Sequence, residues 1–337
     1  MPESGQPLRL VKMSDVAREA GTSVATVSRV LNNNATVDPE LAQRVTAAAS
    51  KLGYLPNRLA RDLRLQRSSL WLLIISDIEN PFFTSVARGV EDIARRHGFS
   101  VVLCNADEDA KKEAMYLDLA AQQVAAGVIL SPHGSRASVE GLAARSIPLV
   151  AIDRSLDVPV DFVTADSRGG ARLATEYLLG KGWKRVACIT GPKQAETAMQ
   201  RRLGYEDAMT AAGQKPCVLH TPFHAENGRE AADSLLDRER PPDAFFVGNA
   251  TLAMGVLGAL RARGLRHGAD AGLICFDDVP WARVTDPPVP LVAQPAYQIG
   301  STAAELLVKR IDGTLTGPVQ RVVFDNELVL FDDEAVE

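Results

Sequence analysis

Polar and aromatic side chains follow apolar, strand-like runs at six places in this chain. In the first half of the chain, Phe82 and Phe83 come after WLLIIS and the Asn80-Pro81 turn, and Asp153 and Arg154 come at the end of PLVAID. Arg201 lies on a helix after KRVACIT and the Gly191-Pro192 turn, and Phe223 comes after PCVLH. Asn249 ends DAFFVGN, and Asp277 lies in AGLICFDD. Carboxylates and an amide can hydrogen-bond hydroxyl groups, an arginine can span two oxygens, and an aromatic face can stack on an apolar ring face. The set suits a polar, hydroxylated ligand. The alternative is that each Asp or Asn merely caps the helix that follows it.

Signs of catalysis or metal binding are missing from the sequence. It contains no GxSxG, HExxH, P-loop or GxGxxG motif, and the four cysteines have no metal-ligand spacing. The five histidines (His97, His133, His220, His224 and His267) are scattered; His224 follows Phe223 and could reach the ligand, although a surface position is the simpler interpretation. We therefore expect no enzyme activity, no cofactor and no metal site, and we expect the cysteines to be buried free thiols.

The elements that must position these side chains begin near Leu70. Apolar runs alternate with helical patterns of ten to fifteen residues, first up to about residue 165 and then again to residue 294, as expected for βαβ units and parallel sheets. Two such series predict two doubly wound lobes, and a late helix over residues 295–311 crosses back to the first lobe. Folds of this kind bind ligands in a crevice at the carboxyl ends of their strands.

Residues 11–63 carry a different pattern, with three short helical segments. The first covers residues 15–20 behind Ser14, the second begins after Ser23 with VATVSRVLN, and the third is capped by Asp38 with Pro39 in its first turn. Gly21 provides a tight turn between the first two, which makes a helix-turn-helix pattern. On the second helix Val27, Val30 and Leu31 can pack inward, while Val24, Ala25, Ser28 and Arg29 can enter a groove. The alternative is a surface helical hairpin without a nucleic-acid role.

The distribution of charge supports contact with nucleic acid at the amino-terminal end. The net charge is −5 overall, yet residues 1–67 carry ten basic and six acidic side chains, so this part is positive and the rest is strongly negative. A basic head on an acidic body suits local phosphate contact. No apolar run reaches the ~18 residues of a membrane span, and an apolar signal-peptide region is missing, so we expect a cytoplasmic protein.

The segments AGTSVATVSRVLN and LGYLPNRLARDL resemble the DNA-binding head of the LacI (lac repressor) family of bacterial transcription regulators. The rest resembles that family's periplasmic-binding-protein-like regulatory domain, so the resemblance covers nearly the whole chain. It implies an all-α helix-turn-helix head plus an α/β body with two doubly wound parallel-sheet lobes. The implied DNA contacts are Ser23, Val24, Ala25, Thr26, Ser28, Arg29, Asn57, Arg61 and Leu63. The implied effector contacts are Phe82, Phe83, Asp153, Arg154, Arg201, Phe223, Asn249 and Asp277.

The domain division expected from these patterns has four parts. Residues 1–10 form a flexible leader, 11–57 the DNA-binding domain, 58–68 a hinge and 69–337 the regulatory domain. Within that domain the first lobe covers about 69–165 and 295–323, and the second about 166–294 and 324–334. The hinge segment is too short to be a stable helix alone; either it becomes helical on docking or it is a solvated charged linker. The resemblance implies that Arg61 and Leu63 enter the minor groove there, with the leucine wedged between base steps.

The expected function is that of a DNA-binding repressor. It would act as a homodimer on a palindromic operator and respond to a small-molecule effector, a carbohydrate or a derivative of one. Three departures from the family pattern leave the effector's identity open: Ala250 stands where Asp is usual, Cys275 where Gly is common, and residues 291–295 lack the threonines that members often carry. The alternatives are a cytoplasmic sugar-binding module without regulatory DNA binding and an enzyme on the same fold. The final residues show no heptad pattern, so a coiled-coil tetramer is not expected.

Overall fold

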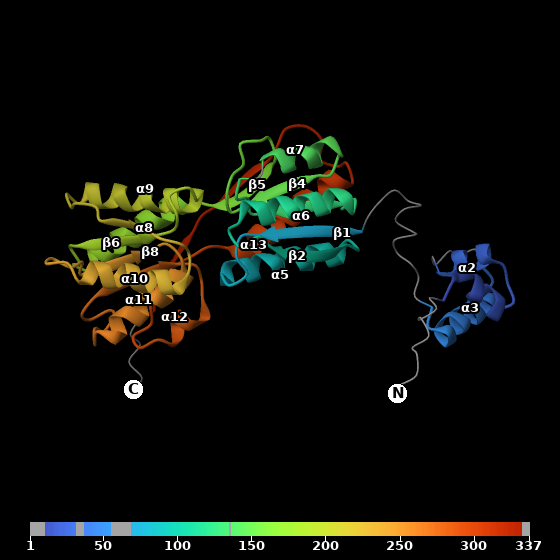
Figure 1. The fold of residues 1–337 in the computed structure, drawn as a ribbon, viewed down its shortest axis with the longest axis horizontal. Helices are drawn as coiled ribbons and strands as arrows, with labels where there is room; N and C mark the ends of the chain where they lie inside the picture. Colours follow the sequence, from blue (N-terminus) through green and yellow to red (C-terminus); the bar gives the residue numbers. More distant parts are fainter. Residues whose placement is uncertain (1–10, 32–36, 55–68, 135, 332–337) are drawn as a thin grey trace, which may run out of the picture. The chain divides into compact units, whose positions relative to one another are not determined.

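A computed structural model describes residues 11–31, 37–54, 69–134 and 136–331 (Figure 1). The chain divides into two compact units, residues 1–68 and residues 69–337. The predicted leader 1–10 and hinge 58–68, with Asn57, Arg61 and Leu63, lie outside the described residues. Among the described residues, no helix is both long and apolar enough to cross a membrane.

The described residues of the first unit form three helices, α1 (Met13–Glu19), α2 (Val24–Leu31) and α3 (Pro39–Leu52). Asp38 caps α3 as predicted, because its carboxylate accepts hydrogen bonds from the backbone amides of residues 40 and 41 at 3.0 and 3.1 Å. The start predicted for α1 is wrong by two residues. Lys12 is the N-cap, and its amide donates to the Asp15 carboxylate at 3.0 Å, so Ser14 lies inside the helix.

The core of this unit joins all three helices around small apolar side chains. Its buried members are Val16, Ala17, Ala20, Val27, Val45, Ala48 and Ala49, with Val30 and Leu31 packed partly against them. The predicted inward face of α2 is thus confirmed. Gly21 adopts a left-handed backbone (φ +62°) between α1 and α2, a conformation that glycine adopts without strain.

The second unit contains two six-stranded sheets. The first has the strand order β11-β5-β4-β3-β1-β2 and the second the order β12-β10-β9-β8-β6-β7. The first consists of β1 (Leu70–Ile75), β2 (Ser100–Asn105), β3 (Gly127–Leu130), β4 (Leu149–Ile152), β5 (Asp161–Ala165) and β11 (Arg321–Phe324). The second consists of β6 (Val186–Thr190), β7 (Val218–His220), β8 (Ala244–Val247), β9 (Gly272–Phe276), β10 (Leu291–Ala293) and β12 (Glu327–Val329). Every pairing is parallel except that of β10 with β12, which is antiparallel.

Helices cover both faces of each sheet (Figure 1), so the predicted fold class of two doubly wound lobes is confirmed. In the first lobe, α5 (Pro81–Arg96) and α13 (Ala296–Ile311) cover one face, and α6 (Ala110–Gln122) and α7 (Arg136–Ala144) cover the other. In the second lobe, α10 (Ala225–Leu236) and α11 (Ala250–Ala262) lie opposite α8 (Ser167–Gly180) and α9 (Glu196–Ala211). A short helix, α12 (Pro280–Val284), follows β9.

The chain passes between the lobes three times, after β5, after β10 and after β11. The crossing to α13 depends on a close helix contact, because a side chain at Gly300 would meet the Val86 carbonyl oxygen at 2.1 Å. The sequence patterns did not predict α7, α12, β11 or β12. The helix α10 begins at Ala225, and Glu226 in its first turn interacts favourably with the helix dipole.

Candidate functional site

A cleft between the two lobes contains all eight residues that the sequence assigned to the effector. Its lining is Asp77, Asn80, Phe82, Phe83, Glu108, Asp153, Arg154, Thr197, Arg201, Phe223, Asn249, Asp277 and Gln294. The space between these side chains measures about 360 Å³, which includes solvent at the mouth of the cleft. Most of the polar side chains that line it are buried.

Two aspartates stand at strand ends in the left-handed backbone region. Asp153 follows β4 with φ +65°, and Asp277 follows β9 with φ +81°. Asp tolerates this region better than most residues, and such strained positions often occur at functional sites. Gln294 donates a hydrogen bond to the Asp277 carboxylate at 2.7 Å, and the Ala250 amide lies 3.4 Å from its other oxygen. Asp277 is thus fixed in the wall of the cleft.

Arg201 reaches the cleft from α9 and is only 4% exposed. Its Nη1 donates to the Gly248 carbonyl, and its guanidinium lies 4.1 Å from the centre of the Phe276 ring. The Nε–H has no partner among the described residues. Burial lowers the pKa of this guanidinium, and the nearby Asp277 and Asp153 offset only part of that effect. A buried donor without a partner is a natural contact for a ligand oxygen.

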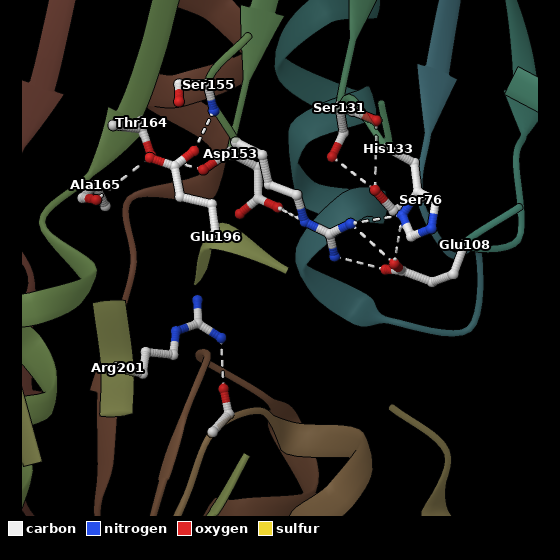
Figure 2. Close-up of polar contacts among 12 residues, drawn as sticks. Ser76, Glu108, Ser131, His133, Asp153, Ser155, Thr164, Ala165, Glu196 and Arg201 are labelled. Carbon is white, nitrogen blue, oxygen red and sulfur yellow. Dashed lines mark hydrogen bonds and ion pairs between the residues drawn. The ribbon is translucent and has the colours of Figure 1, made fainter. Parts of the chain in front are cut away.

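Arg154 lies across the first-lobe side of the cleft and is held by a residue that the sequence analysis missed. Its Nη1 and Nη2 donate to the two carboxylate oxygens of Glu108 at 2.8 and 2.6 Å. His133 places Nδ1 3.1 Å from the same carboxylate, so Glu108 and His133 lie side by side (Figure 2). Burial acts to raise the pKa of Glu108, but the hydrogen bonds from His133 and Arg154 outweigh it and lower that pKa to about 2. Glu108 is therefore an anion wherever the protein is folded at ordinary pH.

Asp153 has the opposite electrostatic environment. Burial raises its pKa to about 6, although the neighbouring Arg154 and Arg201 act to lower it. Its Oδ2 lies 3.6 Å from Arg154 Nε, which is too long for a hydrogen bond. The folded protein thus stabilises the Asp153 anion poorly, and a donor group on a ligand could supply the missing hydrogen bond.

Contacts between the lobes cluster at the end of β4. The Ser155 amide donates to the Glu196 carboxylate of α9 at 2.5 Å, and Arg154 lies 5.9 Å from the centre of the Phe223 ring (Figure 2 shows Ser155 and Glu196 facing each other). Both contacts join a first-lobe residue to a second-lobe residue. Movement of one lobe against the other must therefore change what surrounds Arg154.

Some cleft residues also serve the local structure, as the capping alternative expected. Asn249 Oδ1 accepts from the Leu252 amide at 2.8 Å and so caps α11, and Asn80 caps α5 through the Phe82 amide at 3.0 Å. Phe82 and Phe83 pack edge to face with their centres 5.0 Å apart. Asn249 therefore both caps a helix and lines the cleft.

Besides Glu108, the sequence analysis missed Asp77, Thr197 and Gln294 in this lining. Asp77 and Glu108 follow β1 and β2 within three residues, so the same strand-end rule could have found them. His133 was one of the scattered histidines, and its place beside Glu108 had no signal in the sequence. His224 is the N-cap of α10.

Metal binding has no candidate site in the described parts of the chain, where no three His, Cys, Asp or Glu side chains gather suitably. The four cysteines are free: Cys104, Cys188 and Cys275 are buried and Cys217 is half-buried. Burial raises the pKa of the three buried thiols.

The outer face of α2 presents the side chains that the sequence assigned to DNA. Val24 is 46% exposed, Ala25 and Arg29 are exposed, and Ser28 is half-buried. The Ser23 hydroxyl accepts from the Thr26 amide at 3.1 Å and lies 2.9 Å from the Thr26 hydroxyl, so Ser23 caps the helix. The face is small, with a single long cationic side chain.

A helix-turn-helix unit joined to a two-lobed α/β body with a polar cleft defines the class of ligand-responsive DNA-binding regulators. Comparison with known proteins gives the family. Residues 12–57 match the model of bacterial regulatory proteins of the lacI family, and residues 68–325 match that of periplasmic binding proteins and the sugar-binding domain of the LacI family. The chain belongs to the LacI family of bacterial transcription regulators, as its resemblance predicted.

Full-length relatives support the assignment. The ribose operon repressor of Halalkalibacterium halodurans is 36% identical over 303 residues, which cover 90% of this chain and 91% of that protein. The repressor CytR of Escherichia coli strain K12 is 33% identical over 94% of both chains. Among solved structures, the lac repressor dimer bound to operator matches with a TM-score of 0.84 and 25% identity over 96% of this chain and 98% of that one. A complex of the regulator CelR with cellobiose matches with a TM-score of 0.71 and 33% identity over 95% and 98%.

Proposed function

We propose that this chain is a repressor whose affinity for a palindromic operator is controlled by a small carbohydrate bound in the cleft between its lobes. One observation carries the proposal: eight side chains chosen from the sequence for hydroxyl and ring contacts come together in one cleft between the lobes. Relatives named for the ribose operon and for a cellobiose complex point to the same class of ligand.

The effector contacts divide between the lobes. Phe82, Phe83, Asp153 and Arg154 belong to the first lobe, and Arg201, Phe223, Asn249 and Asp277 belong to the second. A ligand held by both groups stabilises the closed arrangement of the lobes, because it loses half of its contacts when the cleft opens. Carboxylates and the Arg201 Nε–H supply hydrogen bonds to hydroxyls, while the phenylalanine rings pack on the apolar face of a sugar.

On the DNA side, α2 enters the major groove with Arg29 reading a guanine and the small neighbours Ala25 and Ser28 allowing close approach. Ser23 and Thr26 fix the start of that helix and offer hydroxyls to phosphate, and Val24 supplies an apolar contact. Asn57, Arg61 and Leu63, outside the described residues, remain predicted contacts, with the hinge in the minor groove. Two copies of the head on a homodimer require an inverted-repeat site.

Effector and operator are linked through the lobes. Lobe closure changes the arrangement of the two first lobes of the dimer, and with it the free energy of docking both hinges. By linkage, the effector changes operator affinity by the same factor as the operator changes effector affinity. We also infer that the domain division predicted from the sequence holds, that the chain performs no catalysis, and that it acts in the cytoplasm on chromosomal DNA.

The test combines two assays on the full chain. A thermal-shift screen of sugars and polyols identifies the effector, because a ligand at 100 times its Kd stabilises the folded state by ~2.7 kcal/mol. Fluorescence anisotropy with a palindrome selected from random DNA then measures operator affinity with and without that ligand. We expect Arg201→Ala to bind the operator and to ignore the effector. Sugar binding without selective DNA binding would support the sugar-binding module instead, and DNA binding that no cleft variant affects would refute the proposed control.

A further inference from the structure

The charges that line the cleft do not suit an anion. Four carboxylates face two guanidinium groups there; the carboxylates are Asp77, Glu108, Asp153 and Asp277, and the guanidinium groups are Arg154 and Arg201. The residues Asp77, Asp277 and Arg201 are buried, and the side chains of Arg154 and Asp153 are only 7% and 8% exposed, so solvent screens the imbalance only weakly. A phosphate or carboxylate on a ligand would add negative charge to a buried site that already has an excess of it.

Both Nη atoms of Arg154 are engaged by its own lobe, and only its Nε–H lacks a hydrogen-bond partner among the described residues. Glu108 follows β2 and Arg154 follows β4, and these strands are separated in the sheet by β1 and β3. The bidentate pair, at 2.6 and 2.8 Å, therefore lies across the ends of four strands. Arg154 Nη1 is also 3.3 Å from His133 Nδ1. The free Nε–H offers a single donor, whereas an anion that used both Nη atoms would have to displace Glu108 and leave a buried carboxylate without its partner.

Arg201 also has few free hydrogen-bond donors to offer an anionic ligand. Asp277 and Asp153 both act to raise its pKa against the larger effect of burial, because they are carboxylates near its charge. One face is covered by Phe276, and Nη1 is used by the Gly248 carbonyl. The Nε–H that lacks a partner suits a single hydroxyl or ether oxygen, whereas a bidentate phosphate contact requires two parallel N–H donors.

We propose that the cleft selects an uncharged, hydroxylated ligand over its phosphorylated or carboxylated counterparts, and that Glu108 sets this selectivity by holding Arg154. This inference rests on the proposed function and narrows its ligand class. Glu108 is therefore a specificity-determining residue. It pairs with the Arg154 guanidinium and so prevents this cation from binding a phosphate.

Inorganic sulfate tests the inference without knowledge of the effector. Thermal shift of the full chain is measured against sulfate in the millimolar range for wild type, Glu108→Gln, Arg154→Gln, and the double variant Glu108→Gln/Arg154→Gln. The control is Glu79→Gln, which removes an exposed carboxylate of the same lobe that does not line the cleft. It reports the general stabilisation that sulfate gives to any folded protein. The melting transition itself shows whether each variant folds.

We expect wild type and Glu79→Gln to respond alike and without saturation. Glu108→Gln should gain a saturable response at least about tenfold stronger, as one charge-assisted hydrogen bond would give. The double variant should lose that gain. A saturable response in wild type that Arg154→Gln removes, a Glu108→Gln variant no better than wild type, or a gain that survives without Arg154 would each overturn the inference.

Matched pairs of free and phosphorylated sugars separate this inference from the proposed function. Ribose with ribose 5-phosphate, and glucose with glucose 6-phosphate, are suitable probes in the same assay on wild type. Tighter binding of a phosphorylated member would refute the selectivity and leave a carbohydrate-controlled repressor standing. If no carbohydrate binds at all, the proposed function loses its support, while the sulfate comparison still decides whether Glu108 withholds Arg154 from anions.

Discussion

Replacing Asp153 by Asn should stabilise the folded body at neutral pH, although it alters a residue proposed to bind the effector. Burial raises the pKa of Asp153 to about 6, and its carboxylate has no hydrogen-bonded cation. Asn has nearly the same shape, and it tolerates the left-handed backbone found at this position (φ +65°). The variant therefore removes the cost of ionising a buried group and keeps the local geometry.

The magnitude follows from the two pKa values. A folded-state pKa of about 6 against an unfolded value near ~3.9 corresponds to a destabilisation of about 3 kcal/mol. Because the pKa is raised, this destabilisation is present in full above the folded pKa and disappears as the pH falls toward the unfolded value. We expect Asp153→Asn to exceed wild type by about 3 kcal/mol at pH 8 and by about 1 kcal/mol at pH 4.5. The effect of Glu108 on acid stability is the same in wild type and in Asp153→Asn, so it cancels in the difference between their free energies of unfolding.

Urea unfolding at several pH values provides the assay. Fluorescence of Trp71, which is fully buried in the same lobe, follows the transition, and the midpoint and slope give the difference in free energy. Asp118→Asn, on the exposed side of α6, should show no difference that depends on pH. A variant that is no more stable than wild type at pH 8, or an advantage that does not shrink on acidification, would show that attraction to Arg154 and Arg201 outweighs burial.

Further expectations concern the head, the cleft and the helix packing. Arg29→Ala should weaken operator binding and relax one guanine preference, with ~1–3 kcal/mol of discrimination lost in anisotropy titrations; equal affinity for all base substitutions in wild type would contradict the assignment. Asp277→Asn should cost ~1.5–3 kcal/mol in effector binding by calorimetry and leave operator affinity intact, whereas the reverse pattern would place it outside the effector site. Gly300→Ala should destabilise the protein by ~1–3 kcal/mol because its Cβ would meet a carbonyl at 2.1 Å. Gly141→Ala, in the middle of α7 with open space around it, should stabilise by about 1 kcal/mol, and similar melting temperatures for the two variants would refute the packing argument.

Sequence patterns predicted the parallel strands because these are continuous apolar runs, such as β1 and β9, whose residues are almost all buried. The strand β11 lacks that signal: it lies at a sheet edge, and its four paired residues alternate between exposed and half-buried, so none of them is buried. The helix α7 has nine residues, of which only Val139 and Leu142 are buried, so its periodicity was too weak to recognise.

The strand-end rule, together with the family resemblance, found one member of the pair that shapes the cleft and missed the other. Glu108 lies in the acidic stretch DED before α6, where an acidic residue is expected for helix capping alone. Its partner Arg154 lies 46 residues away. Which cation a carboxylate meets depends on strand order in the sheet, and spacing along the chain carries no information about that order.

The three passages between the lobes also affect how the body can be made and altered. The last two strands, β11 and β12, complete the edges of different sheets, and they are separated by only two residues. During synthesis neither lobe can acquire its final strand until residues near 329 have left the ribosome, so both must finish folding at nearly the same time. A chimera that exchanged one lobe with a relative would need three matched junctions, whereas an exchange of the whole body would need a single junction near residue 68.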